Sequence, residues 1–210
     1  MAVSHLELLV EDRSTATVMK IIIPRIAPDL SFAVRSFDGK TDIEKKLTTT
    51  LRGLRSHVRR LDGAVVVVVD RDIEDCRKLR SRIARRAEDA EWSTSERPRH
   101  DAPTVMVRIA VEELEAWFLG DVSAICSAYP RVNPKIHLAR SKLRAPDDVV
   151  GAADELERIL NKAGYHKGRL VKTTAAADIA AHMDVENNHS PSFRAFRDGV
   201  RRLVAVEEMH

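Results

Sequence analysis

The stretch "AVVVVVDRDIEDC", residues 64 to 76, decides the fold because an uninterrupted apolar run leads directly into charged residues. A strand without polar side chains has no face to turn towards water. It is typical of a central strand in a parallel sheet that helices cover on both faces. Parallel α/β sheets bind their ligands beyond the carboxyl ends of the strands. The acidic residues that end this run, Asp70 and Asp72, are therefore candidates for a functional site.

Further apolar segments on both sides of this run predict the rest of the sheet. Strands are expected over residues 5–10, 31–37 and 104–111, and helical patterns separate them. This alternation predicts an α/β fold, Rossmann-like, with a mainly parallel sheet flanked by helices and joined by right-handed crossovers. Only helical patterns follow residue 130 or so. We expect an α/β catalytic core over residues 1–128 and a helical C-terminal extension over residues 129–210 that packs on it.

The composition sets limits on the class of protein. Among 210 residues, 35 Lys and Arg stand against 32 Asp and Glu, so the net charge of +3 does not by itself indicate a polyanionic partner. The two cysteines, Cys76 and Cys126, are too few for a disulfide framework or a four-cysteine zinc site. The N-terminus lacks the features of a signal peptide, and no run approaches the roughly 18 apolar residues of a membrane span. We expect a soluble cytoplasmic protein with no membrane partner.

Carboxylates follow three of the four expected strands. Glu11 ends the first strand, Asp70 ends the third, and Glu113 and Glu115 follow the fourth. In an extended chain, residues two apart point the same way, so Asp70 and Asp72 should face one cluster. Clustered carboxylates repel one another unless a cation neutralises them, and oxygen ligands select Mg²⁺ or Mn²⁺. The pattern predicts a metal site, although each acidic residue taken alone could instead cap a helix.

Three segments carry a resemblance to a known family: "LLVEDRST" (8–15), "VVVVVDRD" (65–72) and "ELEAWFLGD" (113–121). They resemble the signature segments of the Toprim domain, a catalytic module of topoisomerases, primases and several nucleases. The resemblance implies a Toprim-like core with Glu11 as general acid or base and Asp70 and Asp72 as metal ligands. It makes Glu113 and Glu115 candidates for supporting ligands, with a capping role as the alternative for each. The Toprim pattern more often has Gly where this chain has Asp12.

Nearly the whole chain is also similar to the bacterial domain-of-unknown-function family 4276, whose members include the AriB-like effector of the PARIS phage-defence system. The segments "FDGKTDIEKKL" (37–47), "GYHKGRLVKTTAAADIAAHMD" (164–184) and "SPSFRAF" (190–196) carry this similarity. It implies a metal-dependent nuclease that cleaves RNA such as tRNA, or DNA, in anti-phage defence. It also implies an ATPase of the defence system as a partner. A homodimer is a further expectation for so small a nuclease.

A nuclease must also hold its polyanionic substrate, and basic clusters are the candidates for phosphate contacts. The residues concerned are Arg52, Arg55 and Arg59 on one expected helix, and Lys167, Arg169 and Lys172 in a later segment. The alternative for an arginine-rich helix face is a solvated surface with no ligand.

Two other functions compete with the nuclease. A strand followed by Asp-x-Asp also fits a haloacid-dehalogenase-like phosphatase, but here a strand and a helix precede the motif and no later acidic motif follows a strand. A non-catalytic or partner-regulated Toprim-like protein bound to an ATPase is the second alternative. Tyr129 and Tyr165 lie outside the expected sheet, which disfavours a topoisomerase, and two cysteines cannot form the usual zinc region of a primase.

Overall fold

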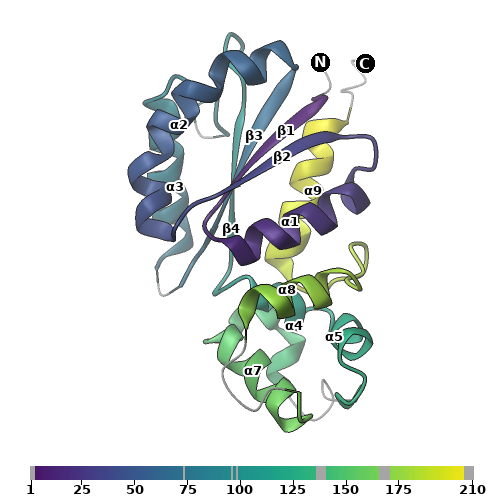
Figure 1. Cartoon of the computed structure of the whole chain (residues 1–210). Coiled ribbons are helices and arrows are strands. Elements are labelled where there is room, and N and C mark those ends of the chain that lie inside the picture. Colours follow the sequence, from purple (N-terminus) through teal and green to yellow (C-terminus); the bar gives the residue numbers. More distant parts are fainter. Residues whose placement is uncertain are drawn as a thin grey trace.

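The computed structural model describes residues 3–72, 74–95, 97, 99–135, 141–165 and 171–205. Its centre is one sheet of four strands, all parallel, in the order β2-β1-β3-β4 (Figure 1). The strands are β1 (His5–Val10), β2 (Ser31–Ser36), β3 (Gly63–Asp70) and β4 (Val105–Ala110). The prediction of an α/β fold with a parallel sheet is confirmed, and the expected strand limits agree with the observed ones to within about a residue.

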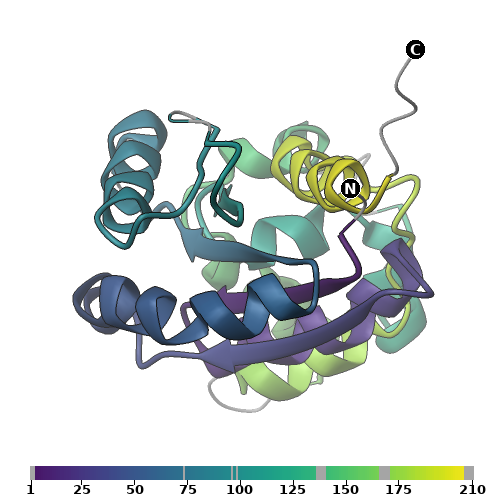
Figure 2. The same cartoon turned by 90° about the horizontal axis from the view of Figure 1, so that it is seen from above.

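Helices cover both faces of the sheet. Seen from above, α2 and α3 lie on one side and α1 and α9 on the other (Figure 2). The helices are α1 (Arg13–Ile26), α2 (Lys40–Arg60), α3 (Cys76–Glu88), α4 (Glu115–Leu119), α5 (Val122–Ala128), α7 (Ala152–Lys162), α8 (Lys172–Ala180) and α9 (Pro191–Val204). Two short 3₁₀ helices are η1 (Ser141–Arg144) and η2 (Pro146–Asp148). None of the helices in these described ranges has the length and apolarity to cross a membrane.

The apolar run of β3 is buried on both faces, as its composition predicts. Val66 and Val68 belong to the core beneath α1 and α9, whereas Val65, Val67 and Val69 belong to the core beneath α2 and α3. Alternate side chains of a strand point to opposite faces, so one strand supplies both cores. This strand therefore holds the three layers of the sheet and helices together.

Side-chain caps fix where two of the helices begin. The Asp12 carboxylate accepts a hydrogen bond of 2.7 Å from the Thr15 N–H and caps α1. The Ser190 hydroxyl accepts one of 3.1 Å from the Phe193 N–H and caps α9, with Pro191 in the first turn. These caps satisfy backbone donors that the helices cannot satisfy internally.

The helices α4, α5, α7 and α8 gather beyond the carboxyl ends of the strands and form a helical lobe (Figure 1). The chain then returns to the sheet as α9, which packs against β4. One continuous apolar core runs from Leu6 of β1 through Trp117 of α4 to Phe196 of α9. The lobe and the sheet therefore share a core, and α4 and α5 of the lobe already precede residue 129. The division of the chain at residues 128 and 129 stays a prediction.

A buried polar network joins the lobe to α9. The Asp147 carboxylate accepts hydrogen bonds from the Ser190 hydroxyl at 2.6 Å and from the Ser192 N–H at 2.7 Å. The Trp117 indole donates to the Ser192 hydroxyl at 2.9 Å, and the Asn188 amide donates to the Trp117 carbonyl at 2.8 Å. Each buried polar group thus has a partner, which is the condition for such a network to stabilise the fold.

Gly120 lies against this network with no room for a side chain. An added Cβ would lie 2.4 Å from the Asn188 Oδ1 and 2.8 Å from the Ser190 nitrogen. We expect Gly120→Ala to lower the free energy of unfolding by about 1 to 3 kcal/mol, because the clash meets tightly packed groups. Gly53, in an exposed part of α2 with nothing within 4 Å, is the matched control. Gly53→Ala should raise stability by about 0.5 to 1 kcal/mol. Urea denaturation measures the free energy of unfolding of both variants. The same change in Gly120→Ala and in Gly53→Ala would contradict the packing argument.

Candidate active site

The strand order places two of the predicted acidic residues at the topological switch point. From β1 the chain crosses to β2 on one side, whereas β3 and β4 lie on the other side. Ligands of open parallel sheets bind where the order reverses in this way. Glu11 follows β1 and Asp70 ends β3, and the Glu11 carboxylate accepts a hydrogen bond of 3.1 Å from the Asp70 N–H. The structure therefore brings Glu11 and Asp70 together, as predicted.

Burial and mutual repulsion shape the ionisation of these two carboxyls. Burial raises the pKa of Asp70 well above its usual range, and the charges of Glu11 and Glu115 raise it further. Burial also raises the pKa of Glu11, although the hydrogen bond from the Asp70 N–H and the charge of Lys40 oppose this. In the part of the chain that the structure describes, no donor reaches the Asp70 carboxylate. Its oxygens are thus open to an added cation.

Glu115 belongs to the same acidic cluster and Glu113 has a second contact. Glu115 begins α4 with 4% of its surface exposed, and burial raises the pKa of its carboxyl. The Lys172 ammonium lies 3.5 Å from Glu115 and 3.7 Å from Glu113. The other oxygen of Glu113 accepts a hydrogen bond of 2.8 Å from the Ala153 N–H at the start of α7. Glu113 therefore makes a capping contact, which is the role that the sequence offered as the alternative to a metal ligand.

Asp72 differs from its predicted geometry. The strand ends at Asp70, and Asp72 has a φ of +52°, in the left-handed region. The expectation that the chain stays extended and turns Asp70 and Asp72 the same way is therefore wrong. The Asp72 carboxylate instead accepts a hydrogen bond of 2.5 Å from the Lys40 ammonium. Its charge still raises the pKa of Glu11 and Asp70, so it lies at the rim of the cluster.

Two lysines flank the acidic cluster. Burial lowers the pKa of Lys40, but the hydrogen bond and charge of Asp72 outweigh it, so the net change is upwards. The pKa of Lys172 is raised for the same reason, by Glu115 and Glu113. Lys40 was missed by the sequence analysis. Its signal was a Gly-Lys pair between a strand and a helix, where Gly39 has a φ of +92° and Lys40 begins α2.

The acidic cluster has the type of donor that hard divalent cations prefer. Glu11, Asp70 and Glu115 offer carboxylate oxygens from three separate elements, and the preferred ligands of Mg²⁺ and Mn²⁺ are oxygens. Among the described residues, these carboxylates do not form a set of three ligand atoms within 4.8 Å of one another. The cluster is therefore not a preformed set of ligands, and a cation that bound there would offset the repulsion between the carboxylates.

The predicted nucleic-acid contacts of α2 are not brought to this cluster. The Arg52 and Arg59 guanidinium groups donate to the carbonyls of Asp89 at 3.0 Å and Asp101 at 2.5 Å, and Arg55 pairs with Glu91. A helix rises 1.5 Å per residue, so Arg52 and Arg59 lie about 18 and 28 Å along α2 from its first residue. Their role in binding stays a prediction. Lys167 and Arg169 lie outside the described residues.

A basic groove lies along the edge of β4, and an acidic hollow separates it from the cluster. A hollow of about 680 Å³ beside Asp72 shares Cys76 and Arg77 with a second hollow of about 820 Å³ along the outer edge of β4. The arginines that line the second hollow are Arg77, Arg80, Arg108 and Arg202. Burial lowers the pKa of Arg108 to about 10, and the charges of Arg80 and Arg202 add to this. Cations gathered in this way favour an anionic ligand.

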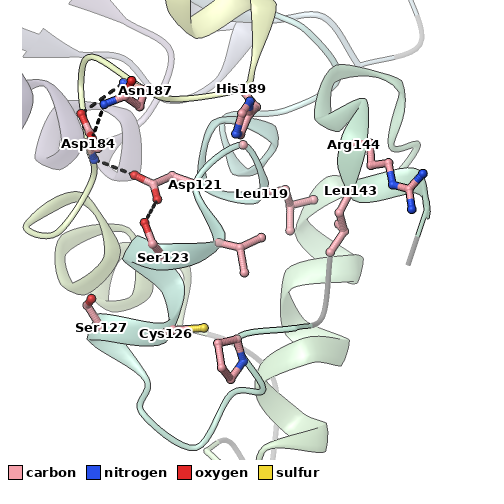
Figure 3. Close-up of a pocket in the computed structure, with 13 residues that line it drawn as sticks. Leu119, Asp121, Ser123, Cys126, Ser127, Leu143, Arg144, Asp184, Asn187 and His189 are labelled. Atoms are coloured by element: carbon pink, nitrogen blue, oxygen red, sulfur yellow. Dashed lines mark hydrogen bonds between the residues drawn. The ribbon is translucent and has the colours of Figure 1, made fainter. Parts of the chain in front are cut away.

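A further cavity of about 690 Å³ lies in the helical lobe (Figure 3). Asp121 caps α5, accepts from the Ser123 hydroxyl, and accepts a hydrogen bond of 2.6 Å from the Asp184 N–H. Asp184 in turn bonds to Asn187. The acidic groups of this cavity are thus occupied in caps and turns, and none of the predicted site residues lines it.

Comparison with family models shows to which family the chain belongs. A family described as a domain of unknown function, DUF4276, matches residues 10–201. The chain belongs to the DUF4276 family. The matched range of this DUF4276 protein includes every residue of the acidic cluster and both flanking lysines. No curated protein and no solved structure matches the chain.

We expect Asp70→Asn to stabilise the protein in EDTA, and to do so more at pH 8 than at pH 4. The pKa of Asp70 is higher in the folded than in the unfolded chain. Between the unfolded value of about 4 and the folded value, the unfolded chain loses its proton first, so stability falls as pH rises. The substitution removes this loss. Denaturant titrations at the two pH values measure the change in the free energy of unfolding, with exposed Asp29→Asn as the control. An increase in stability that is the same at both pH values would contradict the raised pKa of Asp70.

Proposed function

We propose that this DUF4276 protein is a metal-dependent nuclease that cleaves phosphodiester bonds in nucleic acid. The observation that carries the proposal is the convergence of Glu11, Asp70 and Glu115 at the switch point of the sheet, with the pKa of each carboxyl raised. The resemblance of three segments to the Toprim signature supports it, because those segments supply all three residues. Perturbed carboxyls in such a place are typical of catalytic sites.

The side chains suggest a division of labour. A Mg²⁺ or Mn²⁺ ion held by Asp70 and Glu115 would stabilise charge on the phosphoryl oxygens and lower the pKa of a bound water, while Glu11 stays uncoordinated. Glu11 is oriented by the Asp70 N–H, and its raised pKa brings its carboxyl nearer to the range in which it can exchange a proton at neutral pH. Lys40 and Lys172 place two positive charges beside the cluster, and these would attract the phosphate once a metal ion neutralises the carboxylates.

The groove along β4 fits the phosphate backbone of the substrate. Arg77 lines both this groove and the hollow beside Asp72, which is otherwise lined mainly by carboxylates, so phosphates bound along β4 would approach the acidic edge at Arg77. Phosphate contacts dominate the affinity of proteins for nucleic acid. The similarity to AriB-like effectors makes tRNA the first substrate to test and DNA the second. The anti-phage role, the ATPase partner and a homodimer follow from that similarity and from size, and belong to the proposal.

Cleavage by the purified protein tests the activity. We expect Mg²⁺- or Mn²⁺-dependent cutting of tRNA or plasmid DNA, with none in EDTA. Asp70→Asn should lower the rate by about a hundredfold or more, because a ligand is lost from the metal site. Asp29→Asn should cut as the wild type does. Cutting in EDTA, or by Asp70→Asn at the wild-type rate, would contradict the proposal. A wild type that cuts only when the ATPase is added would support the partner-regulated form of it.

The salt dependence of binding tests the groove. We expect the double variant Arg77→Gln/Arg202→Gln to lower the slope of log K against log salt by about two on duplex nucleic acid, since each phosphate contact contributes about 0.9. The double variant Arg52→Gln/Arg59→Gln on α2 is the comparison. Both pairs are introduced with Asp70→Asn so that the substrate stays intact. A smaller slope in the α2 double variant alone would contradict binding in the groove and would indicate that the substrate binds along α2.

A further inference from the structure

A second cluster of ligand-type side chains lies at the opposite end of the sheet from the acidic site. It consists of His5 and Glu7 of β1 and His57 near the end of α2. In the described part of the chain these three form the one set of three or more His, Cys, Asp or Glu side chains whose ligand atoms lie within 4.8 Å of one another. None of the three is among the site residues predicted from the sequence.

The cluster is buried between β1 and α2. Successive residues of a strand alternate between faces, so His5 and Glu7 share the face of Leu9, which packs beneath α2, whereas Leu6 and Leu8 face the other core. His5 is 7% exposed and Glu7 is 1% exposed. Burying a carboxylate and an imidazole on a core face is costly unless strong partners compensate them.

The available partners leave one ligand atom of each residue uncommitted. The buried Nε2 of His5 has no hydrogen-bond partner in the described structure. It lies 3.6 Å from the Glu7 Oε1, and the His57 Nε2 lies 3.6 Å from the same oxygen. Both distances exceed those of N–H···O hydrogen bonds. Zinc bonds of 2.0 to 2.2 Å at tetrahedral angles place ligand atoms about 3.4 Å apart, close to these separations.

The far side of two of the ligands is held by a neighbouring group. The His5 Nδ1 lies 2.9 Å from the Ser31 hydroxyl, and the Arg35 guanidinium donates to the Glu7 Oε2 at 3.0 Å. Contacts of this kind orient metal ligands and fix which ring nitrogen is available. His57 differs, because its Nδ1 lies 3.3 Å from the guanidinium of Arg60, which donates only to an unprotonated nitrogen. Arg60 is exposed, so this contact is exchanged for water when Nδ1 carries the proton and Nε2 binds an ion.

We propose that His5 Nε2, Glu7 Oε1 and His57 Nε2 form a binding site for Zn²⁺ or a similar transition-metal ion. Two imidazoles and one carboxylate favour such an ion over Mg²⁺. The His57 side chain is 42% exposed, so the fourth position opens to solvent and takes a water. The bound ion fixes the end of α2 to the start of β1. This site is separate from the acidic cluster and does not depend on the proposed nuclease activity.

Calorimetric titration of the tag-free full chain with Zn²⁺ tests the site. The protein is first freed of metal with EDTA and then titrated with excess Mg²⁺ present, which occupies the acidic cluster. We expect one equivalent of Zn²⁺ to bind, and His57→Ala to lower the affinity by about a hundredfold or more. His57 is partly exposed, so this variant should fold. Glu7→Gln, which keeps the size of the side chain, should weaken binding to a similar degree.

Two controls separate this site from other zinc ligands. His182→Ala, at an exposed histidine, and Asp70→Asn, in the acidic cluster, should both bind Zn²⁺ as the wild type does. Co²⁺ bound to the wild type should give the strong visible absorption of a four-coordinate ion, and His57→Ala should abolish it. Absence of zinc binding, wild-type affinity in His57→Ala, or loss of binding in Asp70→Asn would each overturn the proposal.

Discussion

β3 is apolar from Ala64 to Val69, and both of its faces are buried, so helices must cover the sheet on each side. Parallel neighbours and long crossovers follow from that burial, because only crossovers bring helices over both faces. The same arrangement aligns the carboxyl ends of β1, β3 and β4 at one edge. The acidic residues that follow these strands then meet although they lie up to about a hundred residues apart in the chain.

This convergence has a cost for stability. Burial disfavours the charged form of both Asp70 and Glu115, and the charges of Glu11 and Glu115 add repulsion at Asp70. Lys40 and Lys172 offset part of the repulsion from the two sides of the cluster, through Asp72 on one side and through Glu113 and Glu115 on the other. Among the described ion pairs neither lysine reaches Asp70, although the charge of Asp70 contributes to the raised pKa of Lys172. A cation beside Asp70 would relieve the remaining repulsion, so an ion bound there would also stabilise the fold.

The sequence predicted most of the fold because local signals agreed with the tertiary structure. The apolar run of β3, the cap at Asp12 and the cap at Ser190 are each specified within a few residues. The site was predicted in part. That Glu11 and Asp70 would meet follows from strand order alone. The turn at Asp72 could not be predicted, because a left-handed residue outside glycine depends on the contact that holds it, here the ammonium of Lys40 some thirty residues earlier.

Other contacts could not be foreseen for a different reason. Arg52 and Arg59 form a basic helix face in the sequence, and nothing local indicates that carbonyls of Asp89 and Asp101 will accept their hydrogen bonds. The His5 and Glu7 pair, by contrast, was visible: residues two apart on a strand share a face, and two ionisable side chains on the inner face of an otherwise apolar strand require a compensating partner.

The position of α2 gives the two ends of the sheet a common element. Its first residue, Lys40, holds Asp72 at the acidic edge, and its last turns carry His57 at the opposite edge. The two clusters differ in chemistry because their ligands differ: carboxylate oxygens suit a hard ion, and imidazole nitrogens suit a softer one. α2 thus supplies one side chain to each edge of the sheet, and the two clusters stay separate because the length of the helix lies between them.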